Sequence, residues 1–236
     1  MDSSERQYVA GAACEVGQRR TLTVEVFFDF ICPWCLIGKR NLEAAITRFT
    51  GLRPDVQLRV LWRSHRLLPF TPTEGEPYQA FYLDRLGSLE AVAARRSQVR
   101  RAGIEVGIDF AFERMEVLPN TAAAHELTAY AASRSNEAQR ARLIERLFIA
   151  YFVEGMNIGD LQILERLGVE CGFDQQGLVN HRTESTSMAD PTGRTTPDIG
   201  HHIGGVPHYA FNSRYTLSGA HAPGAIVEAM MLAIRD

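Results

Sequence analysis

Residues 29–40, DFICPWCLIGKR, contain two of the four cysteines of the 236-residue chain, Cys32 and Cys35, in a C-x-x-C arrangement. The run before them, TLTVEVFFDF (21–30), is β-branched and aromatic, which is typical of a buried central strand. The residues after them repeat with helical spacing, with Leu36, Leu42, Ala45, Ile46 and Phe49 along one stripe and Lys39, Arg40 and Glu43 off it. The pair is therefore predicted to lie where a buried strand ends and a helix begins.

That position has a chemical consequence for Cys32. At a helix N-cap, unpaired backbone N–H groups and the helix dipole favour an anion, and thiols so placed have a pKa of roughly 3.5 to 7.5 instead of about 8.5. Pro33 fits the first helical position, where its missing N–H is no loss. Cys35 lies one turn further in, where it is suited to resolve a mixed disulfide formed at Cys32. The pattern favours a redox couple.

Two other interpretations of the pair fit less well. A zinc site needs four ligands, usually from a second C-x-x-C or a paired histidine, whereas Cys14 and Cys171 are isolated and His201–His202 has no cysteine beside it. A passive structural disulfide is disfavoured in a reducing compartment. No metal is therefore expected.

Composition points to a soluble globular protein with no polyanionic partner. The chain is 45% hydrophobic and 22% charged, with a net charge of -3, and this gives no electrostatic case for nucleic acid or an anionic membrane. Neither a signal peptide nor an apolar run of about 18 residues is present. A cytoplasmic location is the default expectation.

The remaining patterns indicate a divided α/β domain. VQLRVLWRS (56–64) alternates like a strand and, linked to the first through a helix, is expected to run parallel to it. PFTPTEGEPY (69–78) is interpreted as a linker, and the chain to about residue 185 is mainly helical in pattern. PHYAFNSRYTLSG (207–219) predicts two short strands around Asn212-Ser213, and a final helix opens at Pro223.

Four blocks in this order resemble the DsbA-type thioredoxin-fold oxidoreductases, and most closely their FrnE-like branch, several members of which are associated with polyketide biosynthesis. The blocks are FFDFICPWCLIGKRNLE (27–43), NTAAAHEL (120–127), LFIAYFVEGMNIGD (147–160) and GGVPHYAFNSRYTLSGAHAP (204–223). The resemblance implies an α/β thioredoxin fold with an inserted all-helical domain. The expected divisions are a loose tail (1–20), a thioredoxin-like domain (21–72 and 186–236) and the inserted helical domain (73–185).

The resemblance also implies roles for individual residues. Cys32 would be the nucleophilic thiol and Cys35 the resolving thiol, with Pro33 and Trp34 as the active-site dipeptide that sets the redox potential. Pro207 would be the cis-proline that faces the pair, with Val206 offering backbone hydrogen bonds to a bound substrate. From the residues alone, the isomer of the Val206–Pro207 bond stays open. DsbA itself usually has a histidine in its C-x-x-C, so Trp34 implies a less oxidising couple.

Several polar residues and thiols have two interpretations each. His208, where the branch more often has a small polar residue or an aromatic, could hydrogen-bond the thiolate or relay a proton, but a solvent-facing strand residue is favoured. Asn120 and His125 could line a cleft, although capping or packing explains them equally well, and His65 is interpreted as a loop residue near the site. Of the other two cysteines, Cys171 could act as a third redox thiol, but a plain buried thiol is favoured, and Cys14 is expected to be exposed and incidental.

The predicted function is a thiol-disulfide oxidoreductase or isomerase that acts on protein or small-molecule disulfides and needs no cofactor. Glutathione remains a candidate co-substrate. A cellular reductant or oxidant would recycle the enzyme, which is expected to be a monomer or homodimer. One alternative is a glutathione-dependent transferase or isomerase of the kappa-class or 2-hydroxychromene-2-carboxylate isomerase type, whose members usually carry serine in place of Cys32. The other alternative is a non-catalytic holdase. The direction of transfer stays open.

Overall fold

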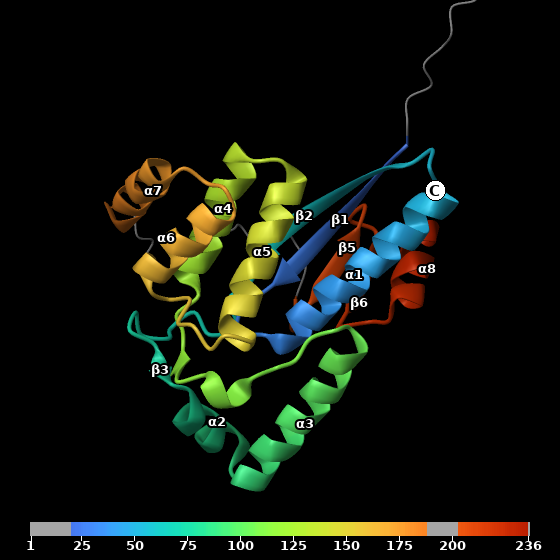
Figure 1. The fold of residues 1–236 in the computed structure, drawn as a ribbon. Helices are drawn as coiled ribbons and strands as arrows, with labels where there is room; N and C mark the ends of the chain where they lie inside the picture. Colours follow the sequence, from blue (N-terminus) through green and yellow to red (C-terminus); the bar gives the residue numbers. More distant parts are fainter. Residues whose placement is uncertain (1–19, 188–202, 236) are drawn as a thin grey trace, which may run out of the picture.

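A four-stranded mixed sheet organises the computed structural model, which describes residues 20–187 and 203–235 (Figure 1). Its strands are β1 (Thr21–Phe28), β2 (Gln57–Ser64), β5 (His208–Phe211) and β6 (Tyr215–Ser218), in the order β2-β1-β5-β6. β1 pairs with β2 in parallel and with β5 antiparallel. The predicted central strand and its parallel partner are confirmed. Because β1 is central, alternate side chains along it are fully buried.

Helix α1 (Pro33–Leu52) follows β1 after four residues and packs beside the C-terminal helix α8 (Pro223–Ala233). Pro33 opens α1 as predicted. Lys39, which the helical pattern places off the apolar stripe, is nevertheless only 2% exposed, with its Nζ 2.6 Å from both Glu43 Oε1 and Glu145 Oε2. The second carboxylate belongs to another helix, so the spacing within α1 could not reveal it. This paired charge joins α1 to the helical segment.

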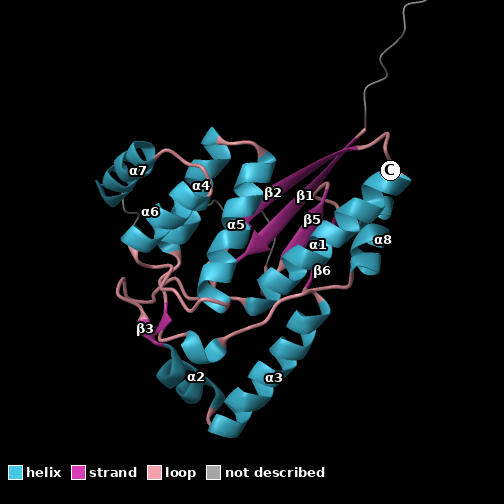
Figure 2. Ribbon diagram, in the orientation of Figure 1, coloured by secondary structure: helices cyan, strands magenta, loops and turns pink. Residues whose placement is uncertain are grey.

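In the described part of the chain between β2 and β5 lie six α-helices and two short strands, and Figure 2 shows how strongly helix dominates there. They are α2 (Tyr78–Leu86), α3 (Leu89–Glu105), α4 (Ala122–Arg134), α5 (Glu137–Phe152), α6 (Leu161–Glu170) and α7 (Gln175–Ser187), with a 3-10 turn at Phe112–Arg114. The expected linker contains a strand, β3 (Glu76–Pro77), which pairs with β4 (Val117–Leu118). Asp160 caps α6, since its carboxylate accepts from the Gln162 and Ile163 N–H groups.

The C-terminal hairpin turns at Asn212 and Ser213, as the sequence predicts. Their φ angles of 49° and 55° are the left-handed values that a two-residue hairpin turn requires. The Asn212 side chain also fixes the turn to its neighbours: its Oδ1 accepts from the Thr23 N–H at 2.9 Å, and its Nδ2 donates to the Ala233 carbonyl at 3.0 Å. This side chain therefore ties β5 and β6 to β1 and α8.

Two hydrophobic clusters form the interior. One joins β1, α1, β5 and α8, and the other joins the C-terminal end of β1 to helices α4 to α6. Cys32 and Cys35 belong to the second cluster, so the C-x-x-C lies where the sheet meets the helical segment. Among the described residues no helix is both long and apolar enough to cross a membrane. The predicted loose tail lies outside them except for Arg20.

Candidate active site

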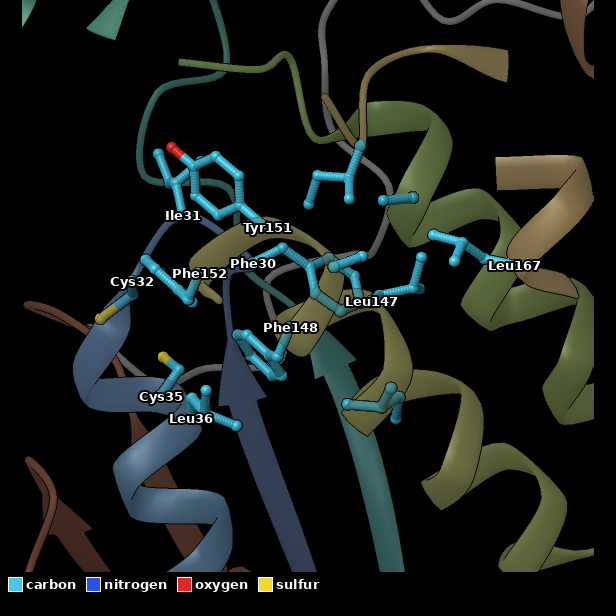
Figure 3. Packing of buried hydrophobic residues seen from close by; sticks show 14 of the residues in the cluster. Phe30, Ile31, Cys32, Cys35, Leu36, Leu147, Phe148, Tyr151, Phe152 and Leu167 are labelled. Carbon is cyan, nitrogen blue, oxygen red and sulfur yellow. The ribbon is translucent and has the colours of Figure 1, made fainter. Parts of the chain in front are cut away.

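The C-x-x-C forms the first turn of α1. Cys32 is the N-cap residue, with extended backbone angles, and its N–H donates to the Asp29 carbonyl at 3.1 Å. The Cys35 N–H donates to the Cys32 carbonyl at 3.0 Å. Both side chains are largely buried, with Cys32 7% and Cys35 2% exposed. In Figure 3 the two sulfurs lie on this single turn, and Cys35 is beside Leu36.

The segment before β5 lies against this turn. The Val206–Pro207 peptide bond is cis, and the Cys32 thiol donates to the Val206 carbonyl at 3.4 Å. Gly38 makes the approach possible, because a Cβ there would lie 2.9 Å from Cγ of Pro207 and would overlap the Tyr209 hydroxyl. Sequence reasoning missed Gly38, although a glycine in mid-helix one turn after a C-x-x-C was a visible signal.

Electrostatics distinguish the two thiols. Burial raises the pKa of Cys35 well above the ordinary thiol range, and the hydrogen bond to Cys32 and the charge of that residue raise it further. A hydrogen bond from the Asp29 N–H lowers the pKa of Cys35, whereas the charge of the Asp29 carboxylate raises it. Cys35 therefore holds its proton while Cys32 is ionised and can donate it in a hydrogen bond to the Cys32 sulfur. The two thiols of the C-x-x-C therefore lie in different electrostatic surroundings.

A buried carboxylate anchors the turn from behind, and sequence reasoning missed it. Asp29 is fully buried; its Oδ1 lies 3.2 Å from His125 Nε2 on α4, and its Oδ2 accepts from the Leu67 N–H at 2.6 Å. Burial alone would raise the pKa of Asp29, but His125, Leu67 and a hydrogen bond with Thr121 outweigh it and hold the pKa below its usual value. A charged side chain between a buried strand and the C-x-x-C was the available signal.

An aromatic and cationic surface borders the turn on the side of α2 and α3. The guanidinium of Arg95 lies 5.6 Å from the ring centroid of Trp34. Tyr82 packs against the cluster that contains Cys32. Burial, together with the charge of Cys32, raises the pKa of Tyr82 to about 12. The positive charges of Arg85 and Arg95 lower this pKa in part. A negatively charged group near Trp34 would therefore meet positive potential.

His208 differs from the favoured expectation. It is only 7% exposed, not solvent-facing. Its Nδ1 lies 2.7 Å from the Ser218 hydroxyl on the partner strand, and its ring centroid is 5.8 Å from that of Phe27 on β1. Because β5 is an inner strand with β1 on one side and β6 on the other, a residue next to the cis-proline is covered by both. The alternation pattern of a four-residue strand could not reveal this.

The other candidate residues lie away from the C-x-x-C turn in the contacts that the structure gives them. Asn120 accepts from Arg66 Nη2 through its Oδ1 and donates to the Thr71 carbonyl through its Nδ2, so it fastens the loop after β2 to the start of α4. Cys171 is a buried free thiol at the C-cap of α6, and burial raises its pKa. Cys14 lies outside the described residues. Within the described ranges no three His, Cys, Asp or Glu side chains form a group that could hold a metal.

Comparison with known proteins agrees with this geometry. The family model of the DsbA-like thioredoxin domain matches residues 23–231. The chain belongs to the DsbA-like family. The predicted DsbA-like thioredoxin fold is thereby confirmed. Among curated proteins, the uncharacterised YwbO of Bacillus subtilis is 27% identical over 154 residues, which cover 65% of this chain and 68% of YwbO.

Three solved structures share the DsbA-like fold at low sequence identity. A probable DsbA oxidoreductase from Streptomyces coelicolor superposes with a TM-score of 0.74 and 21% identity, covering 91% of each chain. A 2-hydroxychromene-2-carboxylate isomerase gives a TM-score of 0.63 at 16% identity, with coverage of 90% and 96%. The cytosolic disulfide reductase DsbM of Pseudomonas aeruginosa, solved with GSH, gives 0.52 at 17% identity, with coverage of 89% and 95%.

Proposed function

We propose that the chain is a cytoplasmic thiol-disulfide oxidoreductase in which Cys32 is the nucleophile and Cys35 resolves the mixed disulfide. The observation that carries the proposal is the pair of buried free thiols on the first turn of α1, with the Cys32 thiol hydrogen-bonded to the Val206 carbonyl. A buried second thiol with a raised pKa cannot compete as the attacking group, so the order of the two steps follows from their burial.

The proposed reduction proceeds in two exchanges. The Cys32 thiolate attacks one sulfur of a substrate disulfide, the substrate S–S bond breaks, and the released thiolate takes a proton from water. Cys35 then loses its proton and attacks the Cys32 sulfur, which forms the Cys32–Cys35 disulfide and releases the second substrate sulfur as a thiol. Two electrons pass to the substrate, and a cellular thiol reductant returns them to the enzyme. Oxidation is the reverse sequence.

Loss of the Cys32 charge in the mixed disulfide makes Cys35 easier to deprotonate. While Cys32 is ionised, its charge and its hydrogen bond help to keep the Cys35 proton in place. Once Cys32 is bound in a mixed disulfide, that charge is gone, and the pKa of Cys35 falls toward the value that burial alone sets. The resolving thiol is therefore activated only after the substrate is attached.

Glutathione is proposed as a co-substrate or recycling thiol, and the FrnE-like branch as the chain's place in the family. The guanidinium of Arg95 beside Trp34 favours a thiol with carboxylate groups, and DsbM, a cytosolic disulfide reductase solved with GSH, supports both the compartment and the ligand. The four sequence blocks support the branch and, with it, service to a biosynthetic pathway. A protein disulfide remains the alternative client.

Insulin reduction by dithiothreitol tests the proposal. The wild-type protein should accelerate insulin precipitation, Cys32→Ser should abolish the acceleration, and Cys35→Ser should lower it strongly. If Cys35→Ser instead kept full activity in the presence of glutathione and none without it, the glutathione-dependent transferase or isomerase would be the better assignment. Full activity of Cys32→Ser in preventing aggregation, with no acceleration by any variant, would favour the holdase.

A further inference from the structure

A cavity of about 400 Å³ lies at the edge of the sheet, between the C-terminal half of β2 and helices α4 and α5. Neither Cys32 nor Cys35 lines it. Its volume falls within the range of small-ligand pockets, about 300 to 1,000 Å³. The residues that decide its chemistry are Phe28, Trp62, Arg63, Ala129, Ala132 and Arg140.

Arg140 is the cation of this cavity that lacks a close counter-charge. Its Nη2 donates to the Val60 carbonyl at 2.9 Å, which fixes the guanidinium, while its Nε is buried and has no hydrogen-bond partner in the part of the chain that the structure describes. Burial lowers its pKa, and Glu137 counters this only by its charge at a distance. Burying a guanidinium with one N–H donor unpaired costs free energy, and an anion bound to the guanidinium would offset that cost.

The other guanidinium of the cavity already has a counter-charge. Arg63 forms an ion pair with Glu25, with Nη2 2.7 Å from Oε1 and Nε 2.9 Å from the same oxygen. Glu126 also lines the cavity, but its charge acts on Arg66 and is not among those that act on Arg140. Among the described residues that line the cavity, Arg140 is therefore the guanidinium without an ion-pair partner, which one negative group would supply.

The walls of the cavity fit a ligand with a flat, apolar ring. Trp62 and Phe28 meet edge to face with their centroids 5.3 Å apart, and both rings border the cavity. Opposite them, α4 contributes Ala129 and Ala132, whose small side chains leave the space open. Aromatic rings pack well against such a pair, and a guanidinium with a donor to spare binds a carboxylate through charge-assisted hydrogen bonds.

We propose that this cavity binds a small aromatic monocarboxylate, with its ring against Trp62 and its carboxylate on the guanidinium of Arg140. The site is separate from the C-x-x-C and does not depend on the redox function. His125 forms part of its wall and also bonds to Asp29, so the cavity backs onto the residue that anchors the active-site turn.

Intrinsic fluorescence gives a direct test, because the chain has only two tryptophans, Trp34 and Trp62. In the full-length Trp34→Phe protein, the tryptophan emission comes from Trp62 alone. Phenylacetate can be titrated with excitation at a wavelength that phenylacetate itself does not absorb. We expect a saturable change in Trp62 emission, and binding of the uncharged phenylacetamide about tenfold weaker or worse, as expected for losing a hydrogen bond to a charged group.

Four variants in the same background locate the site. Arg140→Gln should weaken phenylacetate binding about tenfold or more, and Ala132→Phe should fill the cavity and remove the response. Arg101→Gln, an exposed arginine on α3, should change nothing. Thermal melts establish that each variant is folded, and Arg140→Lys, which keeps the charge, should bind more tightly than Arg140→Gln. No saturable response, equal binding of acid and amide, or binding indifferent to both Arg140→Gln and Ala132→Phe would overturn the proposal.

Discussion

The Sγ of Cys32 lies 3.4 Å from the carbonyl oxygen of Val206, although 174 positions separate the two residues. The sequence between them contains the whole helical segment, so the proposed nucleophile and the residue that faces it come from opposite ends of the sequence. Any substrate joined to Cys32 must lie beside the backbone of Val206, whose polar groups can pair with an extended chain. This relationship defines where the client binds in the proposed mechanism.

Removal of the resolving thiol should trap this client. We expect Cys35→Ser to accumulate a mixed disulfide with glutathione when it is treated with glutathione disulfide, because attack by Cys32 proceeds and the second exchange has no nucleophile. Mass spectrometry under non-reducing conditions should find the adduct on Cys32. Cys171→Ser is the matched control: its thiol is buried at the C-cap of α6, far along the chain, and its loss should leave the wild-type reaction unchanged.

The close approach of Pro207 to α1 makes Gly38 sensitive to any side chain. We expect Gly38→Ala to cost roughly 1 to 3 kcal/mol of unfolding free energy, the range for overpacking, because the new methyl group would displace Pro207 and Tyr209. Displacement of Pro207 also moves Val206 away from Cys32, so insulin reduction should slow. Urea denaturation and the reduction assay together measure the two effects.

Gly51, in the last turn of the same helix, provides the matched control. A Cβ there would meet nothing within 4 Å. Gly51→Ala should therefore leave activity unchanged and raise stability by up to about 1 kcal/mol, the difference in helix propensity. Equal effects of the two substitutions would mean that the packing of Pro207 on α1 does not control the site.

The order of elements could be derived from the sequence because each depends on local signals. β1 is a run of β-branched and aromatic residues, α1 opens with Pro33, and the hairpin turns at Asn212-Ser213. The two cysteines were also visible, since their spacing and their place after a strand are local properties. In these cases the information lies within a few residues of the feature.

Contacts between distant segments could not be derived in the same way. Asp29 binds His125 from a helix 96 positions away, and Lys39 is buried because Glu145 reaches it from α5. The burial of His208 depends on strand order, which places β5 between β1 and β6. Such side chains look like ordinary polar residues in the sequence, and only the packing of one element on another gives them partners.

The Asp29–His125 pair should make stability depend on acid pH. Because the pKa of Asp29 in the folded protein lies below its unfolded value of about 3.9, the carboxylate stabilises the native state fully above about pH 4. That contribution is lost as the pH falls through the folded-state pKa. Asp29→Asn removes this charge and disturbs the hydrogen bond to His125, so we expect a loss of roughly 1 to 3 kcal/mol at pH 7, the cost of leaving a buried polar group unsatisfied.

Urea denaturation at neutral pH and below pH 4 separates this charge effect from simple loss of packing. The gap in stability between wild type and Asp29→Asn should be largest at pH 7 and should narrow in acid, where the wild-type carboxylate is protonated too. A gap that stays constant down to pH 3 would indicate that the shape of the side chain, and not its charge, supports the turn.

The guanidinium beside Trp34 should discriminate between disulfides by charge. Arg95 is exposed and lies over the Trp34 ring, where a carboxylate of glutathione disulfide would pass on its way to Cys32. We expect Arg95→Gln to raise KM for glutathione disulfide about threefold, the effect of a partly exposed ion pair, and to leave KM for neutral hydroxyethyl disulfide unchanged. Arg101→Gln, on the same helix, should affect neither substrate.

Added salt should weaken glutathione disulfide binding in the wild type and much less in Arg95→Gln, because only the wild type has this attraction to screen. An identical rise in KM for both disulfides would show instead that Arg95 acts by holding Trp34 in place.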